Sequence, residues 1–183
     1  MVFNINSMRA NLTGGTARPT LFQVIITNPI DTTADNITPF MVQSAQLPTF
    51  QLGMIEVPYM GRKIKEAGDR TFEPWTVTVI NDENFLVRNA MEAWNNAINR
   101  LERNIRDTGS ANGVSYKSQA TVTQFGKTGN VLRVYQFDGI WPENVGAIPV
   151  DWNSTDTYEQ FDITFQFDSF EVLPGATGDA GGR

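Results

Sequence analysis

The chain has 183 residues, carries a formal net charge of −6 at pH 7, and contains neither cysteine nor histidine. These features exclude disulfides, thiolate or imidazole zinc sites, Ser-His-Asp triads and cysteine nucleophiles, and an acidic chain is poorly suited to grip nucleic-acid phosphates. The length fits a single domain over residues 1–183, no apolar run is long enough for membrane insertion, and no secretory signal is visible.

The start of the chain predicts an arm followed by two strands. Residues 1–16 are polar and contain a Gly-Gly pair, which is typical of a flexible N-terminal arm. Residues 21–27 are rich in β-forming side chains and predict the first strand, whereas the Asp/Thr/Asn-rich residues 31–38 predict a loop. Residues 40–47 predict a second strand, which Pro48 ends.

Residues 53–68 predict a protruding hairpin. Side chains alternate in character from Ile55 to Tyr59, which is the two-residue period of a strand. Pro58 cannot donate a backbone hydrogen bond, so this strand lies at an edge or in an arm. Gly61 supplies the reversal, and a basic segment returns from it. A hairpin of this kind is poorly stable alone and needs another surface to lie against.

A second turn and a long strand are expected after the hairpin. Residues 67–70 contain glycine and aspartate, which predict a turn. Residues 71–81 are rich in β-branched side chains and predict a strand with Trp75, Val77 and Val79 on one face.

The clearest element of the sequence is a helix over residues 82–105, capped by Asn81 or Asp82. Its apolar side chains recur at alternating spacings of four and three, and they form one amphipathic stripe: Val87, Met91, Trp94, Ile98, Leu101 and Ile105. A stripe of this length indicates a helix that packs on its own sheet rather than a coiled-coil surface.

The remainder of the chain predicts strands joined by turns. Strands are expected over residues 117–125, 131–137 and 158–170, with turns at residues 126–130 and 141–146. The expected fold class is therefore mainly β, a β-sandwich or distorted barrel of antiparallel strands with one packed α-helix. The glycine-rich residues 174–183 predict a flexible C-terminal tail.

No catalytic or metal-binding constellation emerges from the sequence. The Gly-Lys-Thr at residues 126–128 lacks the upstream glycine of a phosphate-binding loop, because Thr121 stands there. Glu143 and Asp151 are candidates for the carboxylate pair of a glycosidase, but both lie among turn residues, which favours solvated carboxylates. We therefore expect a protein that is not an enzyme and that has no cofactor and no metal.

Three parts of the chain carry a resemblance to a known family. The middle stretch is VPYMGRKIKEAGDRTFEPWTVTVINDENF, an early stretch is ARPTLFQV, and a late one is GIWPENVGAIPVDW followed by YEQFDITFQFDSFE. Together they resemble the tail tube proteins of contractile-tailed, T4-like bacteriophages. The chain departs from that family at residues 25–46 and 103–115 and after Leu173, where we expect loops or arms particular to this chain.

The resemblance implies a structural protein of the virion tail, assembled in the host cytoplasm. Subunits of this family form hexameric rings whose inner sheets join into a β-barrel channel, and the rings stack into the inner tube that conducts DNA during ejection. The implied partners are further copies of the chain, the tail sheath, baseplate and tail terminator proteins, and duplex DNA in transit without specific binding. One alternative is the tube of a phage-derived injection machine, either a tailocin or a type VI secretion system. Another, from a different class, is a β-sandwich carbohydrate-binding module, which clustered exposed aromatic residues would support.

The charge pattern and the resemblance together place self-association at the hairpin. The chain is acidic elsewhere, so a projecting basic hairpin would find complementary charge on an identical copy. The residues expected at the subunit interface are Glu56, Tyr59, Met60, Arg62, Lys63, Lys65, Glu66 and Arg70.

A polar strand face is expected to line the channel, with more Asp and Glu than Lys and Arg, because a wall that binds DNA would slow its release. The candidate residues for this face are Gln160, Asp162, Thr164 and Gln166. The polar face between Gln119 and Thr123 is a second candidate, and the alternation alone does not choose between them.

Overall fold

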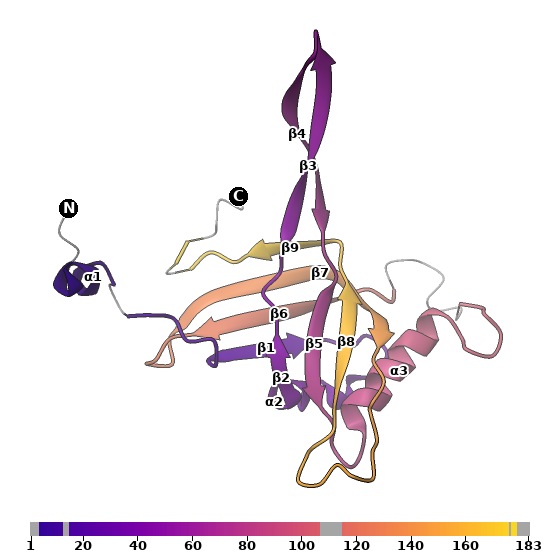
Figure 1. The fold of residues 1–183 in the computed structure, drawn as a ribbon. Helices are drawn as coiled ribbons and strands as arrows, with labels where there is room; N and C mark the ends of the chain where they lie inside the picture. Colours follow the sequence, from indigo (N-terminus) through magenta and orange to yellow (C-terminus); the bar gives the residue numbers. More distant parts are fainter. Residues whose placement is uncertain (1–3, 13–14, 107–114, 176, 179–183) are drawn as a thin grey trace.

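The computed structural model describes residues 4–12, 15–106, 115–175 and 177–178 (Figure 1). Strands make up most of its regular structure. In chain order, its elements are α1 (Ile5–Asn11), β1 (Phe22–Ile26), the 3-10 turn η1 (Thr32–Ala34), α2 (Thr38–Met41), β2 (Val42–Ala45), β3 (Phe50–Tyr59), β4 (Arg62–Phe72), β5 (Trp75–Ile80), α3 (Leu86–Ile98), β6 (Ser118–Phe125), β7 (Val131–Val145), β8 (Gln160–Gln166) and β9 (Ser169–Val172).

Seven of these strands form one antiparallel sheet in the order β1-β6-β7-β8-β5-β2, with β9 paired to β7. β3 and β4 form a separate two-stranded ribbon that stands away from the body (Figure 1). The expected fold class, mainly antiparallel β with one packed helix, is confirmed. None of the helices in the described residues is long and apolar enough to cross a membrane.

β7 carries the sheet round a corner. Its first part pairs with β6 and β9, and its end pairs with β8. Gly139 lies just before this change of partner and has a φ of +70°, which side chains with a Cβ rarely adopt. The turn predicted at residues 141–146 is therefore wrong, because the chain bends inside one continuous strand. Pro142 is accommodated there because a register shift follows it, where the ladder is already interrupted.

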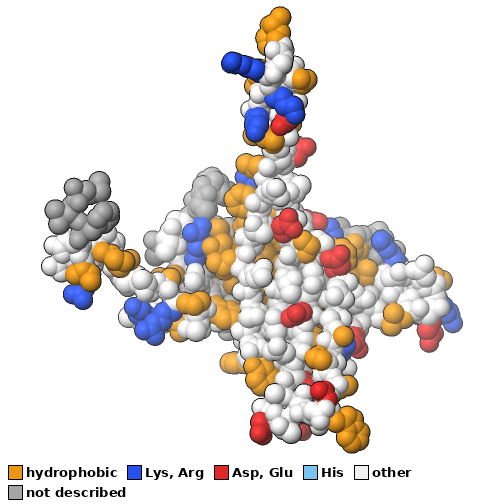
Figure 2. Space-filling model, viewed as in Figure 1, with side chains coloured by type: hydrophobic (Ala, Val, Ile, Leu, Met, Phe, Trp, Pro, Cys, Tyr) orange, Lys and Arg blue, Asp and Glu red, His pale blue; other side chains and the backbone are white. Residues whose placement is uncertain are grey.

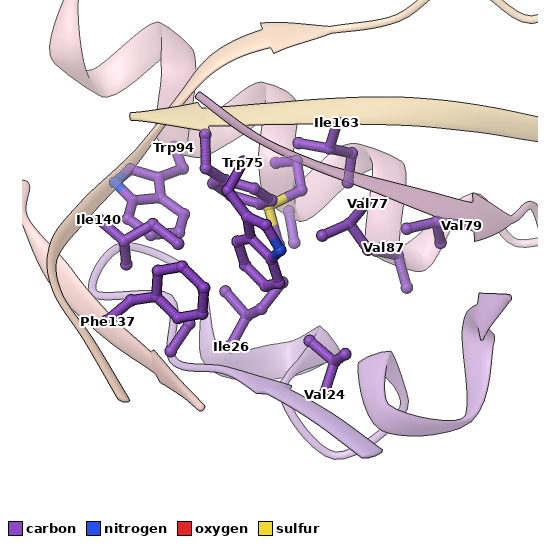
Figure 3. Close-up of a cluster of buried hydrophobic side chains, with 14 of the residues drawn as sticks. Val24, Ile26, Trp75, Val77, Val79, Val87, Trp94, Phe137, Ile140 and Ile163 are labelled. Carbon is purple, nitrogen blue, oxygen red and sulfur yellow. The ribbon is translucent and has the colours of Figure 1, made fainter. Parts of the chain in front are cut away.

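The hydrophobic core lies between the two halves of the bent sheet and α3 (Figure 3). Trp75, Val77 and Val79 of β5 are buried, which confirms the face predicted for this strand. The ring of Trp75 stacks on Phe137 of β7, with centroids 4.4 Å apart. The buried side chains of α3 are Val87, Ala90, Met91 and Trp94.

The helix predicted over residues 82–105 is shorter at both ends. The chain first makes a turn, and the carboxylate of Asp82 accepts a hydrogen bond from the backbone N–H of Leu86 at 3.0 Å. At the other end Asn99 is extended, with a φ of −151°, so the helix cannot continue. Leu101 is consequently 89% exposed and Ile105 is 59% exposed, and neither belongs to the buried stripe.

Asn28 joins the loop after β1 to α3. Its side chain is buried, and its Nδ2 donates to the carbonyl oxygen of Ala90 at 2.9 Å. Its Oδ1 accepts from the backbone N–H of Ile30 at 2.9 Å. Its own backbone N–H donates to the carboxylate of Asp35, at 3.2 Å to Oδ1. This network fixes residues 28–35 against the helix, so the loop predicted at residues 31–38 is ordered and contains η1.

Three predicted strands differ from the structure. The strand expected over residues 71–81 is divided, because Pro74 separates β4 from β5 and cannot donate to a ladder. The strand expected over residues 158–170 is divided into β8 and β9, and at the break the N–H of Asp168 donates to the carbonyl of Asp138 at 3.0 Å. The strand expected over residues 40–47 is shortened to β2 by the single turn of α2.

The two ends of the chain are only partly described. The arm predicted over residues 1–16 contains α1, whose residues are all exposed. Most of the tail predicted over residues 174–183 lies outside the described residues, although Thr177 donates its hydroxyl to the carbonyl oxygen of Leu132 at 2.6 Å.

Candidate self-assembly surfaces

The ribbon of β3 and β4 is longer than the predicted hairpin. Its strands pair from Phe50 opposite Phe72 to Tyr59 opposite Arg62, so the turn predicted at residues 67–70 is wrong. Residues 67–70 instead form a bulge, with a register shift between Leu52 and Met54. At the bulge Gly53 and Gly68 face each other so closely that a Cβ on Gly68 would lie 3.1 Å from the carbonyl carbon of Gly53. Glycine therefore lets the two strands run on through this point.

The ribbon ends in a two-residue turn, as the sequence predicts at Gly61. Met60 and Gly61 have φ values of 44° and 79°, which is the signature of a type I′ turn. Asparagine is the residue usually found at the first of these positions, since it tolerates a positive φ and methionine does not. Met60 is also 88% exposed, so an apolar side chain stands at the tip at a local conformational cost.

The outer half of the ribbon has one charged face and one mostly apolar face, on which Glu66 lies opposite Ile55 and Arg62 opposite Tyr59. On the first face Glu56 lies opposite Lys65, and Glu56 forms an ion pair with Lys63. The second face carries exposed apolar side chains that were not among the predicted interface residues: Ile55, Val57 and Ile64. The two-residue alternation of β3 contained the signal for them. An exposed apolar strip of this kind is typical of a protein–protein contact.

The structure brings most of the predicted interface residues together on this outer half. Arg70 is the exception, since it lies near the base of the ribbon with its guanidinium 4.7 Å from the ring centroid of Phe50. The base is anchored on the body by aromatic contacts. Phe50 lies 5.9 Å from Phe170, and Phe72 lies 5.6 Å from Phe167, measured between ring centroids. Beyond that base, the side chains of the ribbon are exposed.

The residues expected to face a channel lie on the solvent side of β8. Pairing with β5 places Asp162 opposite Thr78, whose hydroxyl donates to the carboxylate at 2.7 Å. Gln166 donates its Nε2 to Glu143 of β7 at 2.8 Å. In Figure 2 the blue side chains lie mainly on the ribbon and the flanks, while the body below the ribbon is white, red and orange. This polar face is therefore acidic, and its side chains are tied to one another.

The second candidate for the channel wall, the face between Gln119 and Thr123 of β6, is also polar and carries an acidic residue of β7. Gln119 of β6 donates its Nε2 to Asp138 of β7 at 2.9 Å, and Gln136 lies opposite Thr121 in the same pair of strands. No lysine or arginine stands among these residues or among those just described on β8. Which of the two faces lines a channel stays a prediction.

The carboxylates considered for a glycosidase do not form a common site. Glu143 accepts the hydrogen bond from Gln166, whereas Asp151 accepts from the backbone N–H of Asn153 at 3.0 Å and holds its own turn. Within the described residues, no group of three or more acidic side chains is placed to hold a metal ion.

The fold occurs in solved components of contractile injection systems. A chain of the anti-feeding prophage tube-terminating cap superposes with a TM-score of 0.63 at 18% identity, covering 86% of this chain and 91% of that one. A chain of the sheath/tube terminator of an extracellular contractile injection system superposes with a TM-score of 0.62 at 15% identity, covering 86% and 96%. These likenesses define the class of fold.

Sequence comparison narrows that class. The model of the family described as phage tail tube protein matches residues 17–173. The tail tube protein gp19 of Enterobacteria phage T6 is 37% identical over 164 residues, which cover 89% of this chain and 96% of the relative. The tail tube protein of Serratia phage KSP90 is 32% identical over 170 residues, covering 89% and 93%. The chain belongs to the phage tail tube protein family.

Proposed function

We propose that six copies of this chain close into a ring, and that the rings stack into the inner tube of a contractile phage tail through which DNA leaves the capsid. The observation that carries the proposal is the exposed ribbon of β3 and β4, with its apolar outer face and its strained methionine tip. An isolated two-stranded ribbon is marginal in water, so it needs a partner surface. Identical copies supply that surface in every ring.

Closure into a ring would also pair the exposed edge strands of the sheet, which are otherwise prone to aggregation. β1 and β2 are the terminal strands of the sheet path, and each leaves a row of backbone groups without a ladder partner in the described residues. Joining sheets across subunits would pair such edges, as in a closed barrel. The tube would then be a structural component of the virion tail without enzymatic activity, assembled in the host cytoplasm.

The proposed partners are the sheath around the tube and the baseplate and terminator at its two ends. The structural neighbours support this, since they include chains of a tube-terminating cap, a sheath/tube terminator and a sheath–tube complex. These neighbours also favour a second candidate, the tube of a phage-derived injection machine. The family match to phage tail tubes favours the first.

The test is a triple charge reversal at the tip, Arg62→Glu with Lys63→Glu and Lys65→Glu. All three side chains are exposed, so the monomer should keep its melting temperature while tube growth stops. Sedimentation of the assembled protein and thermal unfolding of the monomer are the two measurements. Loss of folding in the triple variant, or unchanged tube growth, would contradict the role of the ribbon as a contact between copies. An unchanged chain that forms neither rings nor tubes would contradict the proposed function itself.

A further inference from the structure

The end of the molecule opposite the ribbon carries a loop that matches the ribbon tip in charge and polarity. We call residues 59–65 the ribbon tip and residues 147–159 the acidic loop. The ribbon tip contains Arg62, Lys63 and Lys65 and no acidic residue. The acidic loop contains three carboxylates and no lysine or arginine: Asp151, Asp156 and Glu159.

β5 separates these two parts of the chain. It begins just after the base of the ribbon, and the residue that follows it, Asn81, donates its backbone N–H to the carbonyl oxygen of Glu159 at 2.9 Å. The six residues of β5 span about 20 Å at the rise of a strand. Figure 1 shows the ribbon at one end of the molecule and the 147–159 segment, between β7 and β8, at the other. A translation along this direction therefore brings the tip of one copy toward the loop of the next.

The acidic loop presents apolar side chains in an ordered arrangement. Trp152 is fully exposed at 103%, and Val150 is 82% exposed. The turn that carries Trp152 is closed by the backbone N–H of Ser154, which donates to the carbonyl oxygen of Asp151 at 3.1 Å. Tyr158 is tied to the body, since its hydroxyl accepts from Nε2 of Gln43 at 2.7 Å. A cleft with a volume of ≈ 630 Å³ lies between Val150 and Gln160 in this loop.

We propose that the acidic loop of each copy receives the ribbon tip of a copy in the adjacent ring. Met60 and Tyr59 pack against Val150 and Trp152, and the three basic residues of the tip face the three carboxylates of the loop. Such a head-to-tail contact uses two different surfaces of the same chain, so it repeats without limit along a tube. The inference rests on the proposed function, because it identifies the partner of the ribbon within that assembly.

Figure 2 shows the complementarity on one face of the molecule. Blue side chains and an apolar tip lie at the upper end, and red side chains with an exposed apolar side chain lie at the lower end. Opposite charges across such a contact set its register and speed the encounter of the two surfaces. Exposed tryptophan and methionine side chains are the residues that supply binding energy once they are buried.

The decisive experiment is a charge swap. Asp151→Lys with Asp156→Lys should stop tube growth, as the triple reversal of the ribbon tip should, because each variant sets like charges against each other. A chain that carries both sets of changes should grow tubes again, because an acidic tip then meets a basic loop. Thermal unfolding of each monomer shows whether the loop has kept its fold.

Trp152→Ala tests the apolar part without any change in charge. We expect the protein concentration needed for tube growth to rise about tenfold or more, since a buried interface tryptophan is commonly a hot spot. Leu101→Ala is the control, because Leu101 is also highly exposed, at 89%, but follows the end of α3 and belongs to neither the tip nor the loop. It should grow tubes as the unchanged chain does.

The outcomes separate this inference from the proposed function. An unchanged chain that forms neither rings nor tubes contradicts the proposed function, and the inference fails with it. Two results contradict the inference but not the proposed function: normal tube growth with Trp152→Ala and with the reversed loop, or no recovery of tube growth when both sets of changes are combined.

Discussion

The carboxylate of Asp168 occupies the space that a side chain at Gly139 would need. A Cβ added to Gly139 would lie 2.2 Å from Oδ2 of Asp168. The same carboxylate accepts hydrogen bonds from Nζ of Lys117, with both oxygens at 2.7 Å. Because Gly139 has no side chain, there is room at the corner of β7 for the ion pair between Asp168 and Lys117.

Gly139→Ala should destabilise the monomer by at least about 2 kcal/mol, because it adds a strained φ to a clash with the Asp168 carboxylate. Gly129→Ala is the matched control. Gly129 has a φ of +80° with no atom within 4 Å of an added Cβ, so only the backbone term of about 1 kcal/mol is expected. Urea unfolding of both variants measures the difference, and equal losses would show that Asp168 simply moves away.

Asp35 should make stability depend on pH with an unusual sign. Burial raises the pKa of its carboxyl above 3.8, a nearby Asp31 raises it further, and the backbone N–H of Asn28 offsets part of this. The folded state therefore holds the proton more tightly than the unfolded state. This contribution to stability is fully present below pH 3.8 and is lost as the pH rises through the folded-state pKa.

Asp35→Asn removes that dependence, because the amide stays neutral and its oxygen still accepts from Asn28. The unfolding free energy of the unchanged chain should fall relative to the variant as the pH rises from below 3.8. Asp31→Asn is the opposite control, since hydrogen bonds from Thr33 lower the pKa of Asp31. A difference that is constant with pH, or of the same sign for both variants, would disprove the prediction.

Met60→Asn separates the needs of the fold from those of assembly. Asparagine suits the first position of a type I′ turn, so the melting temperature of the monomer should stay the same or rise slightly. Tube growth should nevertheless weaken, because an apolar side chain is lost from the ribbon tip. Thermal unfolding of the monomer measures the first effect, and sedimentation of assembled protein measures the second. Full tube growth by this variant would show that Met60 makes no contact between copies.

The channel wall can be identified by a lysine placed on each polar face in turn. If the face of β8 lines the channel, tubes with Asp162→Lys should retain short duplex DNA in a salt-dependent way, and tubes with Asp138→Lys should not. The unchanged tube should retain none at physiological salt. Co-sedimentation of DNA with tubes at two salt concentrations is the measurement. Retention by the Asp138 variant alone would assign the channel to the other face.

Local patterns in the sequence predict the core strands because the alternation of apolar and polar residues is enough to identify a half-buried strand. Trp75, Val77 and Val79 alternate with polar residues, and a half-buried strand needs nothing more. The end of α3 was missed because Leu101 and Ile105 continue the helical spacing. Their exposure depends on Asn99, which leaves the helix and donates its Nδ2 to Oδ1 of Asn104 at 2.6 Å.

The ribbon shows a second limit of local patterns. Glycine and aspartate at residues 67–70 are typical of a turn, yet these residues form a bulge because β3 continues opposite them. The basic cluster of the candidate interface was visible in the sequence, and the alternation of β3 indicated its apolar side chains. Which residues of β4 share a face with them follows from the pairing register, which the sequence does not show. Arg70 was grouped with the tip by its position in the chain, and the register places it near the base instead.

Electron microscopy of the purified, unchanged chain tests the central claim most directly. Images taken over a range of protein concentrations, in low and in moderate salt, should show rings of six subunits and tubes with an open central channel, without any added metal or ligand. Only monomers under all these conditions, even with a baseplate or another nucleating end present, would contradict the claim that this chain builds a tail tube.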